Sequence, residues 1–253
     1  MKSLLPAVLL ALVPCTDGLQ AAMIMIDDFG APNPAAVFLI KMGHPNSVPV
    51  EQGGLPSIVG GERDVLVSVQ GEPSVQSAQM LIGHEDSLFG RGVFQIATAR
   101  DPGTVVTLQY DGEDIDGNEL TNSRLLSLDL TGGGTNTDLV IEFLSVDAPG
   151  ADGLDLQIRL TSSLGGAAVF DDIVPESMQQ QSVFAPYASF NTTGEFSFAA
   201  IDSIEIEFNR VALTDIDFEI GSISTVPEPT AGLLLALGMT AAGLPRRRFR
   251  QGS

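Results

Sequence analysis

The densest group of side chains able to bind an ion lies between residues 111 and 119, where carboxylates surround two glycines. Carboxylate oxygens are ligands that Ca²⁺ prefers, and a glycine lets the chain turn around the ion. The spacing differs from that of an EF-hand, because the twelfth position of such a loop would be Ser123 instead of glutamate. We therefore take Asp114 and Asp116 as candidate calcium ligands, with a solvated hairpin loop as the alternative.

A second candidate calcium site combines the two ends of the expected domain. Asp27 and Asp28 lie near the expected start of the mature chain, whereas Asp217 lies on the last expected strand. Sandwich modules often bind a structural calcium ion where their first and last strands meet. By this analogy, Asp28 and Asp217 are expected to share an ion.

Catalytic groups are scarce in this sequence. The only two histidines, His44 and His84, have neither the spacing of zinc ligands nor a partner for a triad. The three glycines at 132–134 are expected to join two strands, so they do not form a phosphate-binding loop that leads into a helix. We therefore expect a protein without enzymatic activity and without a required cofactor. A hydrolase with dispersed carboxylates is the alternative.

Sugar binding would require exposed aromatic rings, which are few here. The chain has no tryptophan and two tyrosines, Tyr110 and Tyr187, and its phenylalanines fall mostly in strand patterns that predict a core. A carbohydrate-binding or adhesive module that uses loops at one end of the domain is the alternative function, with extracellular polysaccharide as its partner.

Charge restricts the partners further. The chain has 32 acidic and 12 basic side chains and a formal net charge of −20. Such a charge repels nucleic acid, so no nucleic-acid partner is expected, and it attracts cations such as calcium. An acidic surface that serves only solubility is the simpler interpretation.

The elements that position these residues are short strands separated by glycine- and proline-containing turns. Alternation of apolar and polar residues is clearest at 154–160 and 204–208. We predict an all-β fold, an antiparallel β-sandwich of jelly-roll type, in a single domain over residues 23–225. The expected strands are 24–29, 65–69, 93–97, 104–110, 125–130, 139–146, 154–160, 169–174, 201–208 and 216–223.

The N-terminus has the layout of a secretory signal peptide. Lys2 precedes an apolar run from Leu4 to Val13, which is shorter than the about twenty residues that span a bilayer. We expect residues 1–22 to be removed after Ala21 or Ala22 during export by the Sec machinery. A buried first helix and lipoprotein processing at Cys15 are the alternatives.

The C-terminus, residues 226–253, has three parts in a fixed order. The first is the motif Val226, Pro227, Glu228 and Pro229; the second is the apolar segment 231–244; the third is the basic end Arg246, Arg247, Arg248 and Arg250. Because the two prolines lack amide hydrogens, we expect them to keep the motif out of strands and helices. The apolar segment is expected to be a short membrane helix of about 21 Å, with the arginines on the cytoplasmic side.

This order closely resembles the PEP-CTERM sorting signal of Gram-negative bacteria, and the segments at 110–112, 128–131, 202–206 and 215–218 resemble the secreted domain that often precedes it. The resemblance implies processing by an exosortase, a membrane enzyme that acts on such tails. It predicts a non-enzymatic protein of the cell surface, outer membrane or extracellular matrix, anchored transiently in the inner membrane.

Overall fold

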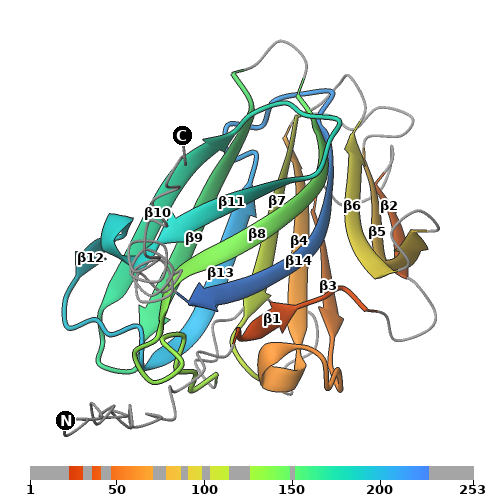
Figure 1. Ribbon diagram of the computed structural model, residues 1–253. Coiled ribbons are helices and arrows are strands. Elements are labelled where there is room, and N and C mark those ends of the chain that lie inside the picture. Colours follow the sequence, from red (N-terminus) through yellow and green to blue (C-terminus); the bar gives the residue numbers. More distant parts are fainter. Residues whose placement is uncertain are drawn as a thin grey trace, which may run out of the picture.

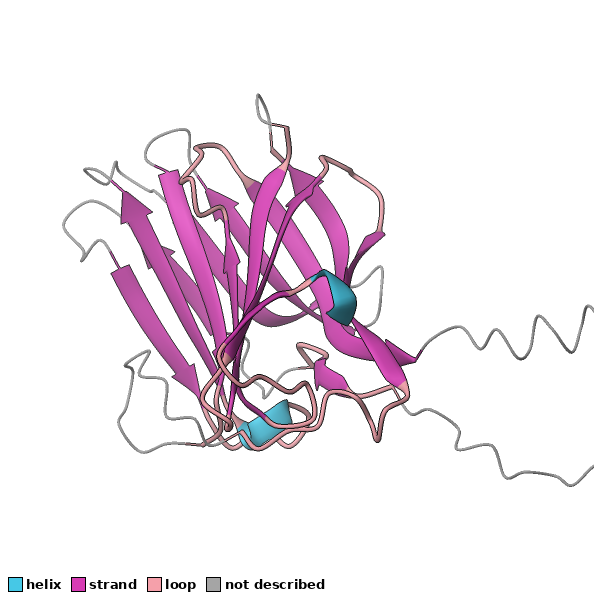
Figure 2. Cartoon of the chain, turned by 90° about the vertical axis from the view of Figure 1, so that its left-hand side faces the viewer, coloured by secondary structure: helices cyan, strands magenta, loops and turns pink. Residues whose placement is uncertain are grey.

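The computed structural model describes residues 23–30, 36–40, 47–70, 78–86, 91–98, 103–113, 126–148 and 152–227. These residues form two antiparallel sheets that pack face to face, as Figure 2 shows from the side. The predicted all-β sandwich is confirmed. The predicted signal peptide, membrane segment and basic end lie outside the described residues.

Each sheet has seven strands, which are labelled in Figure 1. The first sheet contains, in spatial order, β11 (Gln181–Pro186), β8 (Asn136–Asp147), β14 (Asp217–Pro227), β6 (Arg91–Thr98), β5 (Ala78–Asp86) and β2 (Ala36–Ile40), with β1 (Met25–Asp27) also paired to β14. The second contains β12 (Asn191–Thr193), β10 (Ala167–Val174), β9 (Leu154–Ser162), β13 (Ile201–Phe208), β7 (Gly103–Tyr110), β4 (Arg63–Gln70) and β3 (Ser47–Gln52). Two short 3₁₀ turns, η1 (Val59–Gly61) and η2 (Tyr187–Ser189), complete the described elements.

The core lies between the sheets and follows the alternation seen in the sequence. On β13, Ile204, Ile206 and Phe208 are fully buried, whereas the glutamates between them face outward. The ring of Phe208 lies 5.1 Å from that of Phe218 on the opposite sheet, measured between centroids. Burial of these side chains is the main stabilising term, at about 1.5–3 kcal/mol for each large apolar residue.

The expected strand at 125–130 is wrong. Within its described part, Leu128 forms one isolated bridge to Ile201, and no continuous ladder forms although the amides of Leu126 and Leu130 also donate to carbonyl oxygens of that neighbouring segment. Ser127 has a φ of 49°, which lies outside the β region and breaks the extended backbone. The Asp129 carboxylate then accepts hydrogen bonds from the amides of Thr131 and Gly133, which makes this segment a turn.

Five strands were not expected from the sequence, namely β2, β3, β5, β11 and β12. Four of them, β2, β3, β11 and β12, lie at the edges of the described sheets, where a strand pairs on one side only. The expectation that Pro227 stays out of strands is also wrong, because Pro227 is the last residue of β14 and lies opposite Asn136. A proline can end a strand, since only one ladder hydrogen bond is lost there.

A buried ion pair connects the two sheets. Asp27 on β1 and Arg63 on β4 are both almost inaccessible to solvent, and Arg63 Nη1 lies 2.5 Å from Asp27 Oδ2. The Tyr110 hydroxyl on β7 donates to the same carboxylate oxygen at 2.9 Å, and the amide of Phe29 donates to Oδ1. Gln52 on β3 accepts from the guanidinium. Both charges of the pair are therefore hydrogen-bonded, as buried charges must be.

No helix among the described residues has both the length and the apolar character needed to cross a membrane.

Replacement of Arg63 by methionine should lower the free energy of unfolding by about 3–5 kcal/mol, because it leaves the Asp27 carboxylate buried without its counter-charge. Urea denaturation checks this value. The double variant Arg63→Met/Asp27→Asn should recover part of the loss, since no unpaired charge remains.

The matched control is Arg159→Met. Arg159 is half exposed and lies 3.6 Å from Glu205 on the outer face, so its loss should cost less than about 1 kcal/mol. A similar small cost for Arg63→Met would show that the buried pair does not hold the sheets together.

Candidate functional site

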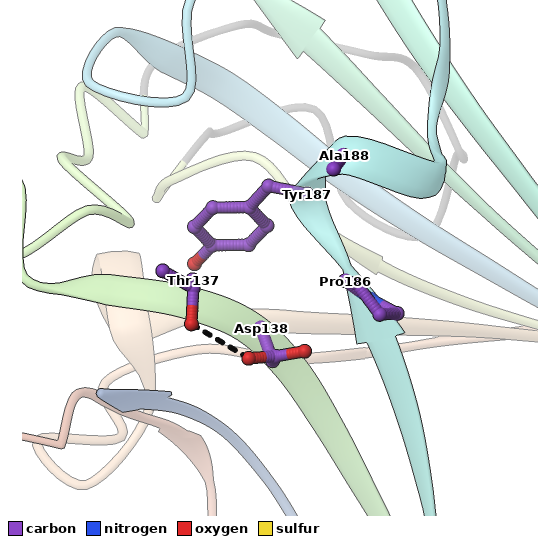
Figure 3. A pocket seen from close by; sticks show the side chains of 5 residues that line it. All are labelled: Thr137, Asp138, Pro186, Tyr187 and Ala188. Atoms are coloured by element: carbon purple, nitrogen blue, oxygen red, sulfur yellow. Dashed lines mark hydrogen bonds between the residues drawn. The ribbon is translucent and has the colours of Figure 1, made fainter. Parts of the chain in front are cut away.

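A pocket of about 300 Å³ lies where β8, β11 and η2 meet. It is lined by Thr137, Asp138, Pro186, Tyr187 and Ala188, as Figure 3 shows. The strand register explains why these residues meet, because Pro186 at the end of β11 lies opposite Asp138 near the start of β8. The chain leaves β11 at this proline and turns directly into η2, which places Tyr187 beside the pair.

The Tyr187 ring is held on two sides. It stacks on Phe198, with 4.2 Å between ring centroids and 13° between the ring planes. Its hydroxyl donates to the carbonyl oxygen of Leu130 at 2.9 Å. Phe198 is supported in turn by edge contacts with Phe190 and Phe196. The pocket therefore has a fixed aromatic wall, so little side-chain entropy is lost when a ligand packs against it.

The polar side of the pocket is acidic. Thr137 donates its hydroxyl hydrogen to Asp138 Oδ2 at 2.7 Å (Figure 3). Burial, and then the negative charges of Asp138 and Asp129, raise the pKa of Tyr187 well above its usual value, so the phenol stays neutral at physiological pH. The pocket thus offers an aromatic wall, a carboxylate acceptor and a hydroxyl. This combination suits a small ligand with both apolar and hydroxyl-bearing surfaces.

The predicted sorting motif begins next to this pocket. Val226 on β14 lies opposite Asp138, and Pro227 lies opposite Asn136, on the side of β8 away from β11. Glu228, Pro229 and the basic end Arg246, Arg247, Arg248 and Arg250 lie outside the described residues. The first two residues of the motif are therefore part of the folded sheet.

The strands do not bring Asp28 and Asp217 together. Asp27 at the end of β1 lies opposite Ile223, whereas Asp217 begins β14 six residues earlier. At about 3.3 Å per residue, this places the two carboxylates roughly 20 Å apart. Asp28 instead accepts a hydrogen bond from the amide of Gly30. The predicted calcium site that joins the first and last strands is therefore not formed.

Asp217 has neighbours of its own. It accepts a hydrogen bond from the amide of Thr98 and lies opposite Asp147 on β8. Burial, followed by the charges of Asp147 and Asp215, raises its pKa above the usual value, despite the Thr98 hydrogen bond. In the part of the chain that the structure describes, no three His, Cys, Asp or Glu side chains are placed to hold a metal ion. Asp114 and Asp116 lie outside that part.

The pocket residues could not be recognised from the sequence as a site. Tyr187 follows a proline outside any motif, and Thr137 and Asp138 stand at the start of an expected strand, where polar residues are common. One feature of the sequence could have pointed to Tyr187. Tyr110 falls within an apolar strand pattern that predicts a buried ring, whereas Tyr187 does not. Tyr110 is indeed fully buried.

Comparison with known proteins gives no family. No family model matches the chain, and no curated protein matches it. Among solved structures, the family 11 carbohydrate-binding module of Clostridium thermocellum, in complex with a mixed-linked tetrasaccharide, is 12% identical, with a TM-score of 0.39 over 81% of this chain and 95% of that chain. An exo-β-agarase is 13% identical, with a TM-score of 0.41 over 81% of this chain and 24% of its own. At these values the likeness carries no argument about function.

Replacement of Asp217 by asparagine should stabilise the protein at neutral pH by up to about 0.5 kcal/mol, since solvent screens this exposed carboxylate. The folded pKa of Asp217 is raised, so protonation favours the folded state, and stability falls as the pH rises from the unfolded value through the folded one. Asparagine avoids this loss and can still accept the Thr98 hydrogen bond. Thermal denaturation between pH 3 and pH 7 checks the gain, which should vanish below about pH 4.

The control is Glu195→Gln, at an exposed position before Phe196. A calcium-dependent stabilisation of the wild type that Asp217→Asn abolishes would contradict this account, because it would make Asp217 a metal ligand.

Proposed function

We propose that this protein is an exported, non-enzymatic module of the bacterial cell surface that binds a neutral polysaccharide in the Tyr187 pocket. The observation that carries the proposal is the fixed Tyr187 ring beside the Asp138 carboxylate, in a cavity of about 300 Å³. The jelly-roll connectivity expected from the sequence is part of this proposal.

A sugar ring matches the two sides of the pocket. Its C–H face packs on an aromatic ring, and its hydroxyl groups donate to a carboxylate. The volume is at the lower end of the range for small-molecule sites, about 300–1,000 Å³, so it suits about one sugar ring of a longer chain. The net charge of −20 disfavours anionic polymers, which leaves neutral ones as the favoured class.

Export and sorting are supported by the positions of the two ends of the domain. β1 and β14 are antiparallel neighbours, with Met25 opposite Ser224, so the chain enters and leaves the sandwich at the same end (Figure 1). The signal peptide and the sorting tail can therefore both reach the same membrane surface. There the Sec machinery would handle the first and an exosortase the second. The opposite end of the sandwich then faces away from the membrane.

The Tyr187→Ala variant should bind neutral polysaccharides at least tenfold more weakly than the wild type, because it removes the aromatic wall. Affinity electrophoresis against mixed-linked β-glucan, agarose and galactomannan, followed by titration calorimetry with the best ligand, checks this. Tyr187→Phe should keep most of the affinity, since the hydroxyl already donates its hydrogen to the carbonyl oxygen of Leu130.

Phe184→Ala is the matched control, because Phe184 is an aromatic residue on the same chain segment that is 54% exposed and does not line the pocket. Its affinity should equal that of the wild type. Equal binding by Tyr187→Ala, or no binding of any neutral polysaccharide by the wild type, would contradict the assignment of the pocket.

Sorting is tested by fractionation and intact-mass analysis after expression in hosts with and without an exosortase. The mature protein should begin at Ala22 or Met23, and it should lose the residues beyond about Pro229 only when the enzyme is present. A tail that persists in both hosts, on a protein that stays in the cytoplasm, would contradict export and sorting together.

A further inference from the structure

The two ends of the sandwich are tied together at one buried side chain, Thr225, which is 0% exposed. Its hydroxyl oxygen accepts a hydrogen bond from the amide of Ile24 at 3.1 Å and from Asn136 Nδ2 at 2.7 Å. Its own amide donates to the carbonyl oxygen of Ile24 at 2.8 Å. We call these three hydrogen bonds the Thr225 latch.

The latch lies beside both of the expected processing sites. Ile24 is the second or third residue of the mature chain if cleavage follows Ala22 or Ala21, respectively. On the other side, Thr225 directly precedes Val226 and Pro227, the first residues of the motif. The same three hydrogen bonds therefore hold the chain next to the signal peptide and the chain next to the sorting tail.

Chain length sets when the latch can close. Before cleavage, about two residues separate Ile24 from the signal peptide, which is at most about 7 Å of extended chain. The folded end of the sandwich would then have to lie against the membrane. Cleavage removes this restraint, so Ile24 can then pair with Thr225 without holding the sandwich against the membrane.

Chain length also limits access to the motif. From Pro227 to the apolar segment at residue 231 there are four peptide steps, which extend to at most about 14 Å. An enzyme that grips an extended stretch at the membrane has little room there while Val226 and Pro227 stay paired with β8. Opening of the end of β14 gives it that room, and the latch opposes this opening.

We propose that the Thr225 latch controls sorting: once the signal peptide is removed, Ile24 fastens the end of β14 and slows access of the processing enzyme to the motif. This regulation rests on the sorting proposed above. It makes the rate of tail removal depend on three hydrogen bonds inside the folded domain. Two of the residues involved, Ile24 and Asn136, are remote from the motif in sequence, and the third, Thr225, directly precedes it.

The first test measures the latch itself by amide hydrogen exchange on the full mature chain, purified in detergent from a host without an exosortase. In Thr225→Val the hydroxyl is lost with little change in shape, so amides at the end of β14 should exchange at least tenfold faster than in the wild type. Thr225→Ser, which keeps the hydroxyl, should exchange at the wild-type rate. If Thr225→Val does not fold, Ile24→Pro removes one donor of the latch instead.

Thr104→Val is the matched control, because Thr104 is 1% exposed on β7 and its hydroxyl makes no hydrogen bond within the described structure. It should leave the end of β14 unchanged. Equal exchange in wild type and Thr225→Val would show that the latch does not hold this strand end.

The second test measures tail removal by pulse-chase in a host with an exosortase. Thr225→Val should be processed several-fold faster than the wild type, with Thr225→Ser and Thr104→Val at the wild-type rate. Faster hydrogen exchange without faster tail removal would contradict the proposal that the latch controls sorting. If the tail of the wild type is never removed, the proposed sorting is wrong, and so is the proposal that the latch regulates it. The hydrogen-exchange result would still measure the strength of the latch.

Discussion

The structure depends on one buried charge pair, Asp27 with Arg63. β1 has only three residues, and among the described strands it pairs with β14 alone, so backbone hydrogen bonds hold it weakly. The Asp27 carboxylate compensates by reaching across the core to Arg63 and Tyr110 on the other sheet. An ion in the core is costly unless it is hydrogen-bonded, and here three neighbours, Phe29, Tyr110 and Gln52, bond to the pair. The pair therefore fixes where the first strand lies, and the register of β1 on β14 follows from it.

The Thr225 latch, the start of the proposed motif and the pocket all lie near β1, because they lie on strands that pair with one another. β1 holds the end of β14 through Ile24 and Thr225, the end of β14 lies opposite the start of β8, and the start of β8 forms the polar side of the pocket. The pocket and the motif share Asp138, which lies opposite both Pro186 and Val226. The pocket proposed for ligand binding and the start of the proposed sorting motif thus lie on neighbouring residues of one sheet.

The sequence was a good guide to the central strands and a poor one to the edges and the pocket. Alternation such as that of Ile204, Ile206 and Phe208 predicts a strand with one buried face, because a core imposes that pattern directly. An edge strand such as β12 carries almost no apolar pattern, and the turn at Asp129 interrupts an alternation of leucines and polar residues that looks like a strand in the sequence. The meeting of Asp138 with Tyr187, like the separation of Asp28 from Asp217, depends on strand register, which single residues do not encode.

The place of β14 has a consequence for how the chain folds. It is the last described strand, yet it lies inside its sheet, between β8 on one side and β6 and β1 on the other. The Ile24–Thr225 hydrogen bond closes a loop of 201 residues, so native contacts of high sequence separation must wait for the whole domain to be made. Under the export proposed above, a chain threaded through a membrane from its N-terminus would keep this sheet incomplete until its final segment has crossed, so completion of the fold would follow completion of transport.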